Sequence, residues 1–240
     1  GGEDVVPPQL AGPWFEVCCH LRMPPVLTSG ALDLWNWRLR DPAGGRALGN
    51  LALTCSMTGT PTEESFHMVP CAMQAAAARV IPKLFLADRL VRGGRAEPLA
   101  ELLRELTDVL LAIKEIFGHV AGSVAPDVFY DVYRPLLDGF FPAGVVLIGV
   151  DPASAATAAP FLSCEATGDG DSGGAGAVRV RSKGPSAGQS TMILLFDLFL
   201  GVAHADVAAD FQEEMLAYMP EAHRQMVVDY REKWRRTPTV

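Results

Sequence analysis

The chain has 240 residues, of which 49% are hydrophobic and 20% charged, the ordinary balance of a soluble globular protein. Its formal net charge of −8 argues against a nucleic-acid partner, because there is no surplus of basic residues to neutralise phosphates. No apolar run reaches the roughly 18 residues that a membrane span needs, so we expect no membrane partner. Five cysteines without a CxxC pair predict neither a disulfide framework nor a zinc site, and they favour a reducing, cytoplasmic location.

The first half of the chain combines one connecting segment with several helices. Residues 1–13 are rich in Gly and Pro and predict a connection. Pro70 should distort the helix around it, because proline removes a backbone donor and clashes one turn back, and Pro82 should act as a stop. The last helix of this half has the clearest pattern, since its apolar residues recur every three or four positions. The predicted helices are residues 27–39, 62–79, 83–91 and 98–120.

The second half begins with a helix that opens at Pro126 and should kink at Pro135. Between residues 151 and 185 Ala, Gly, Ser and Asp dominate, and we expect a flexible loop or insertion, flanked by short strands at 145–150 and 178–180. Strand signals are otherwise few, so the predicted fold class is all-α, in a single helical domain over 1–240. Both ends look cut, and we expect this domain to be truncated at both ends. Further helices are predicted over residues 190–201, 205–219 and 221–236.

Common catalytic motifs are missing from the sequence, which has no GxSxG, no GxGxxG after a strand, no Walker A motif and no HExxH. Its five histidines are scattered, and a lone histidine on an apolar helix is more often a hydrogen-bonded core residue than a ligand. Glu63 and Glu64 fall at positions expected to be exposed on a helix and are interpreted as surface charges. Acid–base hydrolysis therefore finds no support.

A run of small residues, 184–191, precedes a strongly apolar segment. A helix that begins among Ser, Gly and Ala leaves backbone N–H groups free and lets a flat ligand or a carboxylate approach closely. The alternative is a flexible loop, with the helix capped by Ser186 or Ser190. The run alone leaves both interpretations open.

Arg134 stands among aromatic residues on the helix that follows Pro126. A guanidinium at the edge of an apolar pocket suits a planar carboxylate, because it can donate two parallel hydrogen bonds. Phe129 lies five positions earlier, so in a regular helix the two side chains diverge by about 140° unless the kink brings them closer. The alternatives are a surface arginine paired with Asp131 or Asp138, and aromatic residues that are simply core.

Several runs of residues occur together in the order in which one known family has them. The two most specific are Ser186-Ala187-Gly188-Gln189-Ser190 and Tyr218-Met219-Pro220-Glu221-Ala222-His223-Arg224. The others are Met23-Pro24-Pro25-Val26-Leu27, Asn36-Trp37, Asp41-Pro42, Phe66, Ala75–Ala78, Val80-Ile81-Pro82, Phe117, Phe129-Tyr130, Arg134, Phe196-Asp197 and Leu200-Gly201. With these runs the chain resembles the large domain of the indoleamine 2,3-dioxygenases over nearly its whole length apart from residues 151–185.

The resemblance implies a helical haem-binding domain, with haem b as the cofactor and no protein acid or base among its catalytic groups. Members of the family open the indole ring of tryptophan, or of a related indole, with O₂ to give N-formylkynurenine, the reaction of the kynurenine pathway. Asp197 would need an arginine partner, because burying an unpaired carboxylate is costly. By the same resemblance the substrate would be bound by Phe66, Phe129, Arg134, Ser186 and Ala187, and the cofactor would be bound by Phe117, Ser186, Ala187, Gly188 and Asp197.

The sequence also departs from the family pattern. The axial histidine of the family has no counterpart here, so no metal ligand is predicted and the fragment is expected to be inactive alone. Pro70 and His67 replace a small polar or histidine residue and an aromatic one, while Ser29 and Asp33 replace larger or apolar pocket residues. An ionised Asp33 beside an indole pocket is unfavourable, so either it turns away or the substrate differs.

Two other functions therefore stay open beside the dioxygenase. One is a non-enzymatic O₂-binding protein of the same fold, similar in role to a myoglobin. The other is a helical interaction protein that binds no haem and whose aromatic residues are core.

Overall fold

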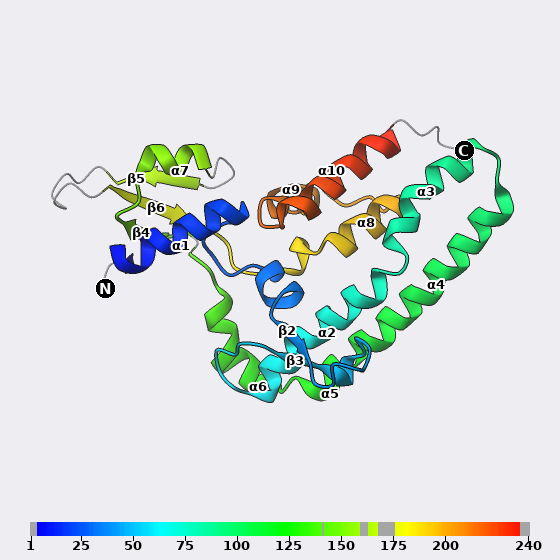
Figure 1. The fold of residues 1–240 in the computed structure, drawn as a ribbon, viewed down its shortest axis with the longest axis horizontal. Helices are drawn as coiled ribbons and strands as arrows, with labels where there is room; N and C mark the ends of the chain where they lie inside the picture. Colours follow the sequence, from blue (N-terminus) through cyan, green and yellow to red (C-terminus); the bar gives the residue numbers. More distant parts are fainter. Residues whose placement is uncertain (1–3, 141, 159–162, 168–175, 236–240) are drawn as a thin grey trace. The chain divides into compact units, whose positions relative to one another are not determined.

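The computed structural model describes residues 4–140, 142–158, 163–167 and 176–235, and most of them are helical, as the all-α prediction requires (Figure 1). The chain divides into two compact units, each assembled from three separate stretches. Unit 1 takes its described residues from Gly1–Ser29, Leu136–Gln189 and Ala205–Arg224, and unit 2 takes them from Gly30–Pro135, Ser190–His204 and Gln225–Val240. Interleaved units of this kind do not by themselves define separate domains, so the single domain with two truncated ends stays a prediction.

Unit 1 is a small sheet with helices packed on it (Figure 1). The strand order is β1-β4-β6-β5, in which β1 runs parallel to β4 and the other neighbours are antiparallel. The elements are β1 (Val5–Val6), α1 (Pro8–Leu21), β4 (Val145–Ile148), α7 (Pro152–Ala158), β5 (Ser163–Ala166), β6 (Ala177–Arg181), the short 3₁₀ turn η5 (Ala187–Gln189) and α9 (Asp206–Leu216).

The core of this sheet follows the alternation that a strand imposes on its side chains. Val178 and Val180 of β6 are buried, and they pair in register with Leu147 and Val145 of β4. Phe15 of α1 packs into the same apolar cluster. The strands expected at 145–150 and 178–180 are thereby confirmed.

Two expectations for unit 1 were wrong. Residues 1–13 are not a plain connection, because α1 begins at Pro8, where a proline is tolerated in the first helical turn. The segment 151–185 is not simply a loop, because it contains α7, β5 and β6. Asp151 starts α7 by accepting hydrogen bonds from the backbone of Ala153 and Ser154. Residues 159–162 and 168–175 of the segment lie outside the described residues.

Unit 2 is a helical assembly with a short hairpin. Helix α2 packs against α4 and β3, and α3 packs against α4 and α8. Its elements are the π turn η1 (Gly30–Leu34), β2 (Trp37–Leu39), η2 (Leu48–Asn50), β3 (Leu51–Leu53), α2 (Pro61–Ala77), α3 (Ile81–Arg92), α4 (Ala96–Gly118), α5 (Val120–Ser123), α6 (Pro126–Val128), the π turn η3 (Phe129–Tyr133), η4 (Arg134–Leu137) up to Pro135, α8 (Thr191–Leu200) and α10 (Glu221–Arg235) from Gln225.

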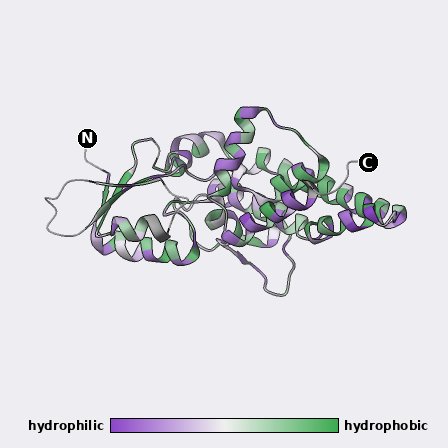
Figure 2. Ribbon diagram, turned by 90° about the horizontal axis from the view of Figure 1, so that it is seen from above, coloured by the Kyte–Doolittle hydropathy of each residue, from purple (hydrophilic) through white to green (hydrophobic). Residues whose placement is uncertain are grey.

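The long helices of this unit are amphipathic, with hydrophobic and hydrophilic residues mixed along the same ribbon (Figure 2). In α4 the buried residues Leu102, Leu106 and Val109 recur every three or four positions, as predicted. Helices α2, α8, α9 and α10 also lie within a few residues of their predicted limits. Phe85 of α3 stacks edge-on against Tyr230 of α10, with ring centroids 4.9 Å apart.

The helix expected over 27–39 was wrong. Only Gly30–Leu34 is helical, and Trp37–Leu39 forms a strand paired with Leu51–Leu53. The Asn36 side chain bonds both the N–H and the C=O of Cys55, which holds the chain in the hairpin. The break expected at Pro82 is confirmed, because α2 ends at Ala77 and Pro82 lies in the first turn of α3.

One stretch of the described residues, Pro61–Arg92, is long and apolar enough to cross a membrane by length and composition alone. The bent pair Ala96–Ser123 and Pro126–Leu137 passes the same test when taken together. The sequence itself contains no uninterrupted apolar run of this length, which is why no membrane-spanning segment was expected. Since core helices of soluble proteins pass this test as well, the absence of a membrane partner stays a prediction.

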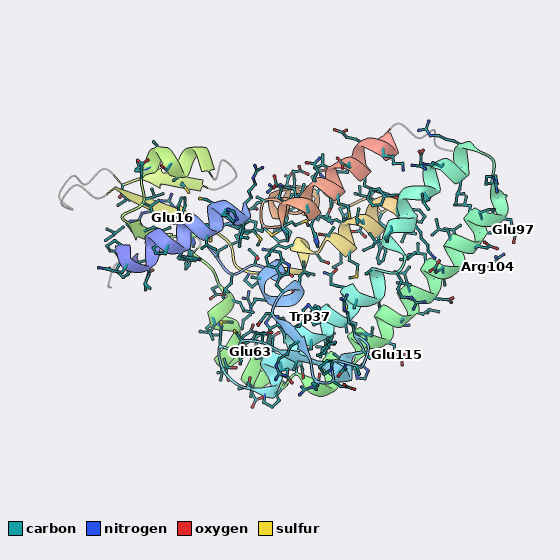
Figure 3. The ribbon with its side chains drawn as sticks, in the orientation of Figure 1. Glu16, Trp37, Glu63, Glu97, Arg104 and Glu115 are labelled. Carbon is teal, nitrogen blue, oxygen red and sulfur yellow. The ribbon has the colours of Figure 1, made fainter. Side chains whose placement is uncertain are left out.

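Glu63, in the first turn of α2, is buried rather than a surface charge (Figure 3). Its carboxylate accepts hydrogen bonds from the hydroxyl of Ser56, from the N–H of Met57, and from both the N–H and the hydroxyl of Thr58. Burial alone would raise the pKa of Glu63, but these hydrogen bonds outweigh it and hold the pKa below its ordinary value. The ionised carboxylate therefore stabilises the loop before α2.

We predict that Glu63→Gln lowers the free energy of unfolding at neutral pH by about 2–4 kcal/mol, because a buried, charge-assisted network is broken. A carboxyl group with a lowered pKa stabilises the fold above its unfolded pKa, and this contribution is lost as the pH falls. The difference between wild type and variant should therefore shrink below about pH 4.5, the ordinary value. Urea unfolding at several pH values measures this difference in the free energy of unfolding, and Glu101→Gln, at an exposed position, is the control. A difference that stays constant with pH would contradict a lowered pKa of Glu63.

Gly184 lies where two backbone segments of unit 1 come together. A Cβ there would be 1.7 Å from the carbonyl oxygen of Leu137, and a Cβ on Gly139 would be 2.4 Å from the nitrogen of Gly184. Gly139 also has a positive φ of 69°. Both positions therefore require glycine, because the atoms in the way belong to the main chain and cannot swing aside.

We predict that Gly184→Ala destabilises the protein by about 3 kcal/mol or more, as overpacking against backbone does. Gly122→Ala in α5 is the control, since no atom lies within 4 Å of a Cβ built there. Thermal unfolding of both variants measures the difference in stability. Equal melting temperatures would show that the backbone near Leu137 can move away from Gly184 at little cost.

Candidate functional site

The structure brings Phe66 and Phe129 together. Phe66 lies on α2 and Phe129 begins η3, and their ring centroids are 4.6 Å apart with the planes inclined by 41°. The ring of Tyr133 contacts both members of the pair, with its centroid 6.0 Å from that of Phe66 and 6.2 Å from that of Phe129. Phe66 and Phe129 are half-buried, whereas Tyr133 is fully buried. Two of the predicted substrate-binding residues thus form one aromatic cluster.

Arg134 is related to Phe129 in a way that the sequence did not predict. The segment Phe129–Tyr133 is a π turn, in which the N–H of Arg134 donates to the carbonyl oxygen of Phe129. A π turn closes between residues five apart, so the two residues lie one turn apart instead of diverging as in a regular α-helix. Arg134 is exposed to solvent. Its role toward a carboxylate stays a prediction.

Three side chains beside the aromatic pair form a hydrogen-bonded chain. Nδ1 of His67 is 2.6 Å from Oδ1 of Asp33, and Nε2 of His67 is bonded to the hydroxyl of Tyr133. His67 comes from α2, Asp33 from the π turn η1 and Tyr133 from the π turn η3. His67 is thus the hydrogen-bonded core histidine that we expected, and Asp33 faces an imidazole rather than an apolar pocket.

The tyrosine keeps its proton in this chain. Burial, followed by the negative charges of Glu63 and Asp33, raises the pKa of Tyr133 far above its ordinary value. A carboxylate only accepts, so Nδ1 of His67 donates to Asp33, and in the neutral imidazole with this tautomer Nε2 accepts the O–H of Tyr133. Sequence patterns indicated no role for Tyr133, because its partner on α2 is distant in the chain.

Phe117 and Asp197, two predicted cofactor-binding residues, lie in the same unit. Phe117, in the last turn of α4, is 59% exposed, so it is not part of the core of this unit. The Oδ2 atom of Asp197 is 2.8 Å from Nε2 of His204. Asp197 thus pairs with a histidine, while the arginine partner that the family resemblance implies was not expected within this chain.

The small-residue run belongs to unit 1 as far as Gln189, and this part contains η5. Phe211 of α9 fills the space beside Gly188, because a Cβ there would be 2.7 Å from the edge of its ring. Ser186 accepts a hydrogen bond from the N–H of Gly188. Ala187 is exposed and Ser186 is half-buried, so these two retain room for a ligand, and their roles stay predictions.

The N-terminus of α8 was also a candidate ligand site. Ser190 is its N-cap residue, but its side chain makes no capping hydrogen bond, contrary to the second interpretation of this run. Its hydroxyl instead accepts a hydrogen bond from Nε2 of Gln74 at 3.1 Å. Ser190 is buried, and it connects α8 to α2 within unit 2.

Haem iron needs one axial residue, for which histidine is a common choice. Both nitrogens of His67 are hydrogen-bonded, which leaves neither of them for a metal. Nε2 of His204 pairs with Asp197, and His20 and His119 are exposed. In the described part of the chain, no group of three or more His, Cys, Asp or Glu residues could hold a metal ion. The described residues therefore single out no histidine as an iron ligand, and the prediction that the axial histidine has no counterpart here stays a prediction.

Comparisons with known proteins identify the family of this chain. The family model described as Indoleamine 2,3-dioxygenase matches residues 2–236. Indoleamine 2,3-dioxygenase 2 of Homo sapiens is 29% identical over 231 residues, which are 94% of this chain and 51% of the relative. An indoleamine 2,3-dioxygenase of Aspergillus nanangensis is 30% identical, over 94% of this chain and 54% of the relative.

A 6-hydroxytryptophan 2,3-dioxygenase of Fusarium equiseti is 27% identical, over 91% of this chain and 50% of the relative. The chain spans about half the length of the curated relatives it matches. Because the family model extends over nearly the whole sequence, from before α1 to the end of α10, the chain belongs to the indoleamine 2,3-dioxygenase family.

Proposed function

We propose that this chain binds tryptophan or a related indole for haem-dependent opening of the indole ring with O₂ to N-formylkynurenine. The observation that carries the proposal is the aromatic pair Phe66 and Phe129, with Arg134 one π turn away. Membership of the family supports the reaction class. The chain would supply groups that bind and orient the substrate, not an acid or base.

The chemistry of these groups suits an amino acid with an indole side chain. Aromatic rings prefer offset or edge-on contacts with another ring, which Phe66 and Phe129 could offer to a flat ligand while excluding water. The guanidinium of Arg134 could donate two parallel hydrogen bonds to the substrate carboxylate. Ser186 and Ala187 belong to the proposal through the family resemblance alone.

Haem b would supply the O₂ chemistry of this family. Since the structure singles out no described histidine for its iron, the part assigned to the residues of this chain is limited to binding and orienting the substrate. The same observation favours a second candidate, a helical protein of this family that binds no haem. A cytoplasmic location and the absence of nucleic-acid and membrane partners are further proposals, supported by the five free cysteines and the net charge of −8.

Calorimetric titration of the chain with L-tryptophan tests the substrate proposal. Arg134→Ala should weaken binding by about 1.5–3 kcal/mol, the value of a charge-assisted bidentate contact. Phe129→Ala should weaken it by about 1 kcal/mol or more, because a ring contact and its buried area are lost.

The matched control is Arg104→Ala on α4, whose guanidinium is exposed and 3.8 Å from Glu97 (Figure 3). It should bind L-tryptophan as the wild type does. Equal affinities for wild type, Arg134→Ala and Phe129→Ala would exclude this cluster as the substrate site.

Haemin titration, read by visible absorption after reduction and addition of CO, tests the cofactor. We expect no histidine-ligated spectrum from this chain, because by the family resemblance none of its histidines corresponds to the axial one. A histidine-ligated spectrum that is lost in His20→Ala or in His119→Ala would identify an exposed ligand and contradict this interpretation.

A further inference from the structure

The chain of Asp33, His67 and Tyr133 is not used by the function proposed above. It is built from residues of three elements, η1, α2 and η3, and all of them belong to unit 2. His67 is 2% exposed and Tyr133 is fully buried, whereas the Asp33 side chain is 13% exposed. The chain therefore runs from the interior to a site that water can reach.

The same side chains are in contact with the aromatic pair. The ring of His67 stands edge-on to Phe66, with centroids 5.3 Å apart and planes at 82°, and edge-on to Tyr133 at 5.5 Å. Tyr133 in turn contacts Phe66 and Phe129. Any rotation of His67 or Tyr133 would thus displace the rings that are proposed to hold the substrate.

We propose that Asp33, His67 and Tyr133 are positioning residues, which hold the Phe66–Phe129 pair in its binding arrangement only while His67 is neutral. The inference rests on the proposed function, because the arrangement matters through the indole that the pair would bind. It adds that ligand binding by this protein depends on the protonation state of the buried His67.

Protonation of His67 would reverse its hydrogen bond with Tyr133. The imidazolium carries hydrogens on both nitrogens, so Nε2 can no longer accept the O–H of Tyr133 and instead donates to the Tyr133 oxygen. The O–H of Tyr133 must then turn away from His67, and because the hydroxyl is buried it needs another acceptor or stays unpaired.

Other ionisable groups nearby do not supply the same response. Glu63, on α2, has a lowered pKa and stays ionised, and burial raises the pKa of the Cys71 thiol to about 11, so it stays neutral. Arg46, which faces Trp37 and acts on Cys71, stays charged. The ionisable side chains on the facing parts of α4 and η3, Lys114, Glu115, Tyr130 and Asp131, are exposed.

The test is calorimetric titration of the 240-residue protein with L-tryptophan at about pH 5 and about pH 8, the range in which histidine side chains in general change charge. Wild type should bind about tenfold more weakly at the lower pH, the scale expected when a buried hydroxyl loses its acceptor. His67→Gln, which can accept from Tyr133 and donate to Asp33 but cannot be protonated, should keep the affinity of the higher pH and lose the pH dependence. His119→Gln, which alters an exposed histidine of the same unit, should behave as wild type.

Asp33→Asn gives a second, conservative test. The amide oxygen still accepts from Nδ1–H, so binding at about pH 8 should be retained. Because the imidazolium loses its counter-charge, the fall in affinity should move to lower pH. Full pH dependence in His67→Gln, or an unchanged midpoint in Asp33→Asn, would overturn the proposal.

A measurement without ligand separates this inference from the substrate proposal. In ¹⁵N NMR of the free protein, His67 should show the tautomer with hydrogen on Nδ1, and the ring signals of Phe66 should shift as His67 titrates. If these signals appear but L-tryptophan does not bind at either pH, the substrate proposal fails and the positioning chain stands. If His67 carries its hydrogen on Nε2, or if the signals of Phe66 do not respond, the positioning chain is wrong.

Discussion

Helix α2 buries two ionisable side chains, Glu63 and His67, one helical turn apart. An unpaired buried charge or polar group costs more free energy than an ordinary hydrogen bond returns, so each must obtain partners from outside the helix. Glu63 obtains them from the loop at residues 56–58, and His67 obtains them from the two π turns. The conformations of these three segments are therefore tied to the position of α2.

The periodic helices could be predicted from the sequence because each buries one apolar stripe. Helix α4 is the clearest case, and its limits differ from the prediction by only two residues at each end. Composition was a poorer guide in residues 1–13, where Pro8 and Gly12 suggested a connection but the apolar Ala11 and Phe15 pack a helix onto β4. Burial of Glu63 was also missed, although Thr60 and Glu63 have the spacing of a capping box, and Thr60 does cap α2.

The candidate site was predictable in its residues but not in its geometry. Family resemblance pointed to Phe66, Phe129 and Arg134, but a count of 3.6 residues per turn placed Arg134 on another side from Phe129. In the structure the π turn places Arg134 one turn after Phe129. A change of helix type over only five residues leaves no pattern in a single sequence from which it could be predicted. Nor could the sequence show that Asp33, His67 and Tyr133 meet, because each pair depends on how distant elements pack.

The interleaving of the two units has a consequence for how the protein folds. Strand β1, near the start of the chain, pairs with β4, which follows more than half of the residues later. Unit 2 likewise needs α8 and the later part of α10 after its main stretch has ended. During synthesis on the ribosome, neither unit can complete its core until most of the chain has emerged, so folding depends on contacts distant in sequence and should be slow. The apolar faces of α1 and α2, which are buried in the folded units, would meanwhile be exposed to solvent.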